Sequence, residues 1–266
     1  MHLTNEILSP ATQIVGGVIA TALMVVAIVQ TRRHATRNTL PMMGALGAFV
    51  LAAQMVNFTS IMGSSGHLIG GVLLAALLGP WAGFLTLSAV IALQALLLGD
   101  GGTLALGCNI LNMAALGALV AYPLVFKPLM GSRNGGGRLV LASVVASIVA
   151  SELGAAGAVA EVALSGVAPL SSSSFATNML SVHLFTGAVE GLATGAILWV
   201  VSRTNAPLLH INFATANDQH HPSILNTVWA FLIGALLIGG GVSHISSDRP
   251  DGLEWSIEQS SYEKQN

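Results

Sequence analysis

The chain has 266 residues, of which 8% are charged and 53% are hydrophobic, and its mean hydropathy is +0.77. Soluble domains contain about 25% charged residues, so this composition excludes an ordinary soluble domain and places the chain in a bilayer. The formal net charge of −2 gives no reason to expect a nucleic-acid partner, and the single cysteine, Cys108, excludes an intrachain disulfide.

Apolar segments long enough to cross a membrane recur along the whole chain. The first segment, residues 12–30, follows ten residues without Lys or Arg, so we interpret it as a retained helix and not as a cleaved signal peptide. Gly79-Pro80 divides the stretch 68–98 into two helical pieces, because proline removes a helix donor and clashes with the preceding turn. These pieces form either two spans or a re-entrant hairpin. The sequence therefore predicts an all-α, polytopic helical membrane protein with about 7–8 transmembrane helices, at residues 12–30, 41–58, 68–98, 104–126, 139–166, 178–201 and 223–243.

The distribution of positive charge predicts the orientation of these spans. Seven of the nine cationic residues fall on one side, which should be cytoplasmic, namely Arg32, Arg33, Arg37, Lys127, Arg133, Arg138 and Arg203. The N-terminus, the 59–67 loop and the C-terminal tail then lie outside the cytoplasmic membrane.

The first two residues, Met1 and His2, can form a metal chelate. The α-amine, the following backbone amide and the His2 imidazole are three nitrogens in fused rings, a planar set that suits Ni(II) or Cu(II) better than Zn(II). We expect His67, on the same face, to supply the fourth donor. Two alternatives remain open: His2 is an arbitrary second residue, and residues 59–67 form an ordinary capped turn.

Three further polar residues are candidates to hydrogen-bond these ligands. A metal-binding histidine usually donates its second ring nitrogen to an acceptor that orients it. Asp100 is a candidate acceptor for His67, or else a turn residue, and Ser65 and Asn109 are the other two candidates.

Several motifs together resemble the substrate-binding membrane component of cobalt/nickel energy-coupling factor (ECF) transporters, the CbiM/NikM type. They are Met1-His2, residues 65–71 (SGHLIGG), 78–82 (LGPWA), 99–102 (GDGG) and 107–113 (GCNILNM). The resemblance covers about residues 1–202 and implies that Met1, His2 and His67 hold Ni(II) or Co(II). It also implies a transmembrane coupling subunit and two cytoplasmic ATPase subunits as partners. Asn5-Glu6 stand where the family usually has a glycine near residue 6.

The C-terminal part has its own resemblance. We expect a cytoplasmic linker at 203–222, which contains His210, His220 and His221, and then an additional transmembrane helix with an external tail at 223–266. Residues 250–254 (PDGLE) resemble a module that accompanies or replaces the small accessory membrane subunit of cobalt/nickel systems, and we expect this module to be truncated. The alternative is a disordered polar tail. We predict that the tail acts in transport and not in metal binding.

Two other functions compete with metal capture. An intramembrane serine protease would use Ser65 and His183, and a stand-alone ion-driven carrier would use Glu152, Glu161 and Glu190. His183 and Glu190 are seven residues apart, so they can form a polar pair on one helix face. The chain contains no Gly-x-x-x-x-Gly-Lys-Ser/Thr motif, so we expect a transporter subunit that is not itself an enzyme and has no cofactor. The sequence leaves the choice between nickel and cobalt open.

Overall fold

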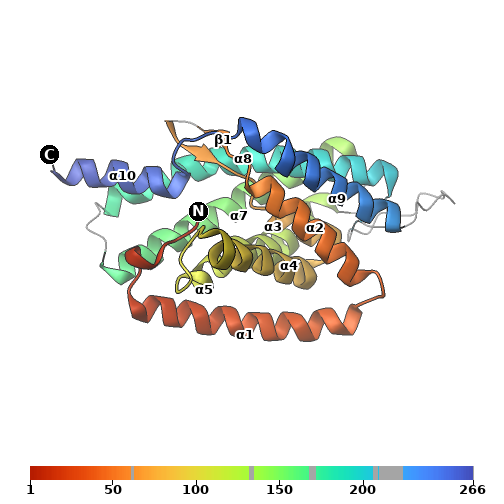
Figure 1. The fold of residues 1–266 in the computed structure, drawn as a ribbon, viewed down its shortest axis with the longest axis horizontal. Coiled ribbons are helices and arrows are strands. Elements are labelled where there is room, and N and C mark those ends of the chain that lie inside the picture. The colour runs from red at the N-terminus through yellow and green to blue at the C-terminus, as the bar shows by residue number, and fades with distance from the viewer. Residues whose placement is uncertain (61–62, 132–134, 168–171, 206–208, 210–223, 266) are drawn as a thin grey trace.

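The computed structural model describes residues 1–60, 63–131, 135–167, 172–205, 209 and 224–265. Figure 1 shows long helices lying roughly side by side, with the C-terminal helix α10 extending from one end. In chain order the elements are the 3-10 turn η1 (Asn5–Ile7), α1 (Pro10–His34), α2 (Thr39–Gln54), β1 (Phe58–Thr59), β2 (Ser65–Gly66), α3 (Gly71–Leu78), α4 (Pro80–Leu93), the π-helix η3 (Gln94–Leu98), α5 (Leu106–Asn109), the π-helix η4 (Ile110–Phe126), α6 (Lys127–Met130), α7 (Gly136–Ser165), α8 (Ser172–Thr204), α9 (Ile224–Gly240), the 3-10 turn η6 (Val242–Ile245) and α10 (Gly252–Gln265).

Five of these helical segments are long and apolar enough to cross a membrane, within the part of the chain that the structure describes. They are Pro10–His34, Pro80–Leu98, Leu106–Met130, Gly136–Ser165 and Ser173–Thr204, and the shorter apolar helices are α2 and α9. The prediction of an all-α polytopic membrane protein is therefore confirmed. The only strands among the described residues, β1 and β2, form a small antiparallel pair in the predicted 59–67 loop.

The first helix shows how the sequence sets both its start and its surroundings. The Ser9 hydroxyl accepts a hydrogen bond from the Thr12 amide, and Pro10 occupies the first helical turn, where its missing donor costs nothing. Many of the apolar residues that follow are exposed, among them Ile14 and Val18. Such a surface is stable only against lipid or a protein partner.

The Gly-Pro break separates a short helix, α3, from the longer helix α4. Helix α3 has eight residues, which at 1.5 Å per residue reach about 12 Å, less than half of a hydrocarbon core of about 30 Å. Seven of its eight residues are buried, so α3 enters the bundle without crossing it. Gly79 has φ +81°, a value that L side chains rarely adopt, and Pro80 begins α4, which returns the chain.

Small residues let the two longest helices approach closely. Gly187, Gly191 and Gly195 recur every fourth residue on α8 and face the backbone of α7 at Ile148, Val144 and Val140. A Cβ at any of these glycines would come within 3.0 Å of α7, so the spacing is a small-xxx-small contact of the kind that joins membrane helices.

The C-terminal part packs against the rest of the chain. Phe231 of α9 meets Phe49 of α2 edge-on at 5.3 Å between ring centroids, and α10 lies against α8. The alternative of a disordered tail is therefore wrong. The predicted linker at 203–222 lies mostly outside the described residues, as do His210, His220 and His221.

Candidate metal centre

The N-terminal segment lies inside the bundle and is held in an extended form. Asn109 of α5 accepts a hydrogen bond from the Leu3 amide at 2.8 Å and donates one to the Leu3 carbonyl at 3.0 Å. The Gly102 amide donates to the same carbonyl. The Asn5 side chain accepts from the amides that precede α5, at Leu104 and Ala105. Asn109 thus positions the residue next to His2, and Asn5 gives the N-terminal loop a defined turn.

The His2 ring is buried and bound to Asp100. Its Nδ1 lies 3.0 Å from Asp100 Oδ1, while its Nε2 is buried with no hydrogen-bond partner among the described residues. Burial of Asp100 acts to raise the pKa of its carboxyl, but the hydrogen bond and charge of His2 outweigh it, so the pKa is lowered. Asp100, a candidate acceptor for His67 or else a turn residue, thus binds the other histidine, His2.

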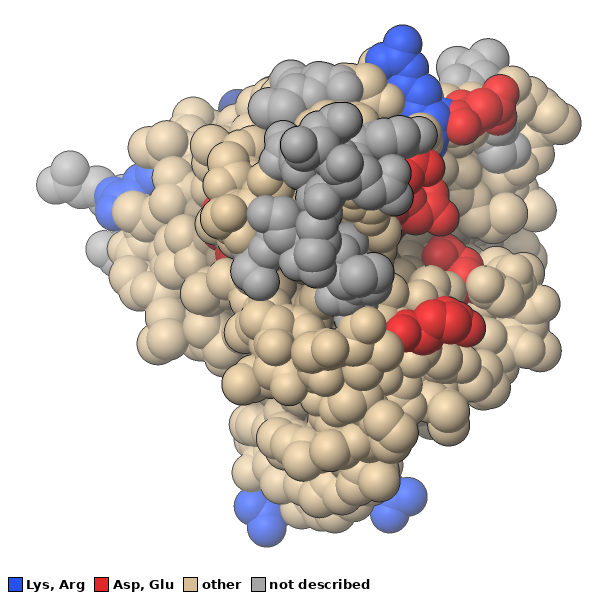
Figure 2. Space-filling view, turned by 90° about the vertical axis from the view of Figure 1, so that its left-hand side faces the viewer, with Lys and Arg blue, Asp and Glu red and all other residues tan. Residues whose placement is uncertain are grey.

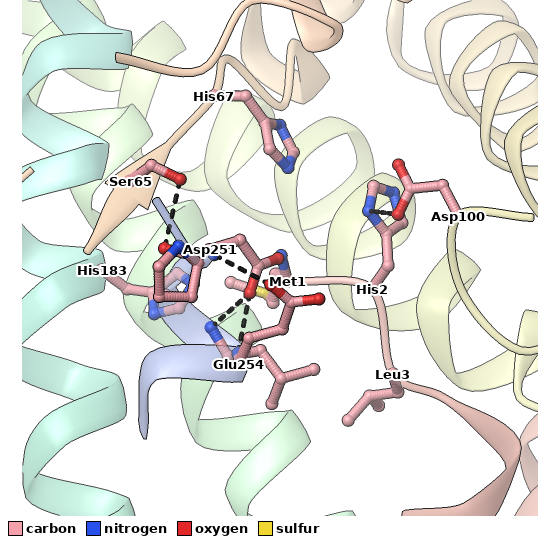
Figure 3. Close-up of polar contacts among 12 residues, drawn as sticks. Met1, His2, Leu3, Ser65, His67, Asp100, His183, Asp251 and Glu254 are labelled. Atoms are coloured by element: carbon pink, nitrogen blue, oxygen red, sulfur yellow. Dashed lines mark hydrogen bonds and ion pairs between the residues drawn. The ribbon is translucent and has the colours of Figure 1, made fainter. Parts of the chain in front are cut away.

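His67 follows β2 and reaches the same place from the opposite direction. Its ring lies 5.5 Å from the His2 ring, centroid to centroid, with only 14° between the planes. Figure 3 shows the His67 ring directed toward Met1 and His2. His67 Nδ1 lies 3.2 Å from the Leu68 carbonyl, which accepts only from an N–H, so the lone pair is at Nε2. Burial, the N-terminal charge and His2 lower the pKa of His67 to about 4, so the ring is neutral near pH 7, as a metal ligand must be.

The α-amine of Met1 has a partner that sequence reasoning missed. Its nitrogen lies 2.8 Å from Asp251 Oδ2, although the two residues are separated by almost the whole chain. Burial acts to raise the pKa of the Asp251 carboxyl, but the ammonium charge and its hydrogen bond dominate and hold that pKa well below its usual range. The tail, which we predicted to act in transport and not in metal binding, therefore contacts the candidate metal site.

Ser65 joins the tail to the predicted site. Its amide donates to the Pro250 carbonyl and its hydroxyl to the Arg249 carbonyl, each at 2.8 Å. A protease would need this hydroxyl on a histidine, but His183 Nδ1 instead lies 2.7 Å from the Met179 carbonyl. Ser65 and His183 line one pocket and do not form the predicted catalytic pair, which argues against the protease.

Two of the three membrane-embedded carboxylates have structural partners, whereas Glu152 has a buried oxygen with no hydrogen-bond partner among the described residues. Glu190 Oε1 accepts from the Gly70 amide at 2.9 Å, where φ is +90°, and so joins α8 to the segment that follows His67. Glu161 Oε2 accepts from Asn112 at 2.7 Å. Glu190 is thus bound to the backbone and not paired with His183, and these contacts weaken the case for an ion-driven carrier.

Two of the predicted ligands, Met1 and His67, line one small pocket, and the His2 ring lies beside it against His67. The pocket is lined by Met1, Ser65, Gly66, His67, Ile69, His183, Thr186, Asp251 and Gly252. Within the described residues, no three His, Cys, Asp or Glu side chains come together as a metal cluster. A metal at this pocket would need main-chain nitrogens in addition to side chains, as the Met1-His2 chelate supplies.

This arrangement defines a class, a multi-pass membrane protein whose N-terminal amine and two buried histidines lie close together. Residues 2–208 match the family described as the cobalt uptake substrate-specific transmembrane region, and residues 225–266 match the PDGLE domain. The chain belongs to the cobalt uptake substrate-specific transmembrane family, a family of nickel and cobalt transport proteins.

Relatives and solved structures agree with this membership. The fused nickel transport protein NikMN of Rhodobacter capsulatus is 31% identical over 97% of this chain and 76% of its own length. The probable fused nickel transport protein LarMN of Lactiplantibacillus plantarum is 43% identical over 46% of this chain, and the aligned part spans only 38% of LarMN. A crystal structure of a truncated transition metal transporter is 30% identical, with a TM-score of 0.66 over 76% of this chain and 99% of that one.

Proposed function

We propose that this chain captures Ni(II) or Co(II) at the external face through the Met1 α-amine, the backbone and ring nitrogens of His2, and His67. The observation that supports this most is that the Met1 amine and the buried His67 imidazole line one pocket, with the buried His2 ring 5.5 Å from the His67 ring. Asn109 holds the residue next to His2, and a backbone contact orients His67. Four nitrogens of this kind suit Ni(II). The family membership supports the choice of metal class.

Binding of the metal releases protons from the ligand nitrogens. The ammonium and the His2 amide must each lose a proton before their nitrogens can bind. A six-membered ring between the His2 amide nitrogen and its imidazole closes through Nδ1, which contacts Asp100 in this structure. The ring therefore has to leave Asp100 on loading, and the Asp100 side chain, 51% exposed, is open to solvation by water when it does.

Titration of the purified protein with Ni(II) and Co(II), alone and in competition, tests this proposal. His67→Ala should weaken binding by more than about 100-fold, because a direct ligand is lost. One residue inserted between Met1 and His2 changes the chelate ring size and should do the same. His34→Ala, an exposed histidine at the far end of α1, is the matched control. If a chain with a blocked or extended N-terminus bound either metal as tightly as the native one, the proposal would be wrong.

We further propose that uptake is driven by partners, a transmembrane coupling subunit and two cytoplasmic ATPases. The chain itself has no phosphate-binding loop motif. Uptake of Ni(II) or Co(II) into cells should therefore require the ATPase subunits, while binding to the purified chain should not. Uptake that persists without ATPases would favour the stand-alone carrier.

A further inference from the structure

Asp251 faces the candidate metal site with one fixed oxygen. Its Oδ1 accepts hydrogen bonds from the Leu253 and Glu254 amides, at 2.8 and 2.9 Å, which makes Asp251 the N-cap of α10. The Glu254 side chain accepts in return from the Asp251 amide, which completes a capping box. Because Oδ1 is occupied in this way, Oδ2 is directed at the Met1 nitrogen (Figure 3).

The tail backbone holds this carboxylate in place. Ser65 binds the carbonyls of Arg249 and Pro250, so the tail is joined to the strand that leads into His67. On the other side, a Cβ at Gly252 would lie 2.9 Å from His183 Cε1, so only glycine lets the chain come this close to α8. Asp251 is thus fixed by the same elements that position His67.

The charges of the site require an anion in both states. Without metal, the Met1 ammonium balances the Asp251 carboxylate. With metal, the amine is neutral and the His2 amide is an anion, so a divalent ion leaves one positive charge. The Asp251 carboxylate, largely buried, would lose its partner if it did not then face the metal, and a buried charge without a partner is strongly destabilising.

The distances also fit coordination. Two donors that bind one ion at right angles, each through a bond of about 2.0 Å, are about 2.8 Å apart. Met1 N and Asp251 Oδ2 are separated by 2.8 Å in this structure. The separation of these two atoms therefore already matches that of two donors bound to one metal.

We propose that Asp251 is a metal ligand, a fifth and anionic donor from outside the plane of the four nitrogens. This inference rests on the proposed function of Met1, His2 and His67 and adds the C-terminal tail to the site. Four planar nitrogens alone favour Ni(II). An added oxygen donor reduces this preference for Ni(II) over Co(II), so Asp251 is the residue that allows Co(II) to bind.

The magnetism of the nickel-loaded protein tests this ligand. Planar four-coordinate Ni(II) is diamagnetic, whereas five-coordinate Ni(II) with an oxygen donor is paramagnetic. The native protein should be paramagnetic and Asp251→Asn diamagnetic, since Asn keeps the helix cap but loses the charge. Asp248→Asn, an exposed aspartate of the same tail, is the matched control and should behave as the native protein does. Co(II) affinity should fall at least about tenfold further than Ni(II) affinity in Asp251→Asn.

Three outcomes would overturn the inference or its basis. A native protein that binds Ni(II) in a planar, diamagnetic form has no fifth donor. An Asp251→Asn variant that stays five-coordinate has a different fifth donor, such as water. If native protein bound neither metal, the proposed function itself would fail. X-ray absorption of the Ni(II)- and Co(II)-loaded native protein counts the donors directly, so a four-coordinate native site would overturn the inference even if Asp251→Asn does not fold.

Discussion

At the scale of single residues, the two histidines of the candidate site have different hydrogen-bond partners. His2 is paired with a carboxylate at Asp100, and His67 has only a backbone carbonyl and a buried setting. Because burial and the nearby Met1 ammonium both disfavour a positive charge on the ring, His67 stays neutral. The cost of this arrangement should appear as a loss of stability in acid.

The pKa of His67 predicts the direction and range of that loss. Its ordinary value is 6.5 and its value in the folded chain is about 4. At pH values between about 4 and 6.5, His67 binds a proton in the unfolded chain but not in the folded chain. The free energy of unfolding should therefore fall as pH drops from 6.5 toward 4. His67 alone should account for up to about 3 kcal/mol. Stability that falls equally in His67→Gln and in the native protein would contradict this cause.

The measurement is the thermal unfolding midpoint of purified protein at a series of pH values across this range. His67→Gln should lose less stability in acid than the native chain, because glutamine has no proton to gain. His244→Gln, an exposed histidine in the segment before the tail, should change nothing.

At the scale of elements, the tail helix depends on a capping box and on one glycine. Asp251 and Glu254 satisfy the first amides of α10, and Gly252 allows contact with α8. The Asp-x-x-Glu spacing is visible in the sequence and predicts a helix start. Treating residues 250–254 only as a family module therefore missed a local signal for α10.

Gly252→Ala should release the tail from the bundle. The added methyl would lie within 3.0 Å of both Val182 and His183, so α10 can no longer rest on α8 in the same position. Gly240→Ala, where nothing lies within 4 Å of the added Cβ, is the matched control. Limited proteolysis of residues 246–265 reports the result: faster cleavage in Gly252→Ala only. Equal protection of both variants would show that the contact is not required for docking.

At the scale of the whole molecule, the sequence predicts the helices but only part of the candidate site. Apolar runs and Gly79-Pro80 predict the helices because each depends on neighbouring residues. The Met1–Asp251 contact joins opposite ends of the chain, and no periodicity or spacing reports such a pair. Likewise, Asp100 faces both histidines in the predicted topology, and only the packed structure shows that it binds His2.

The two ends of the molecule differ in charge. Figure 2 looks at the end with α10, where acidic side chains gather along one side of the face. The exposed acidic residues of the N-terminal segment, the turn after η3 and the C-terminal tail are Glu6, Asp100, Asp248, Glu254 and Glu258. Arg32 and Arg33 in the last turn of α1, Arg203 in the last turn of α8, and Arg37 just after α1 lie at the opposite end of the molecule (Figure 1). An acidic surface raises the local concentration of cations, which suits an end that meets the metal first.

Cysteine labelling of intact cells tests whether this acidic end is external. Cys108 is buried and should not react, so single exposed positions can be compared in the native background. A membrane-impermeant maleimide should label Thr4→Cys and Glu258→Cys in intact cells, because the positive-inside rule places both outside. Thr36→Cys, between α1 and α2, should react only after the membrane is permeabilised. The reverse pattern would place Met1, His2 and His67 on the cytoplasmic side, where they could not capture a metal from outside, and the orientation on which the proposed uptake depends would have to be abandoned.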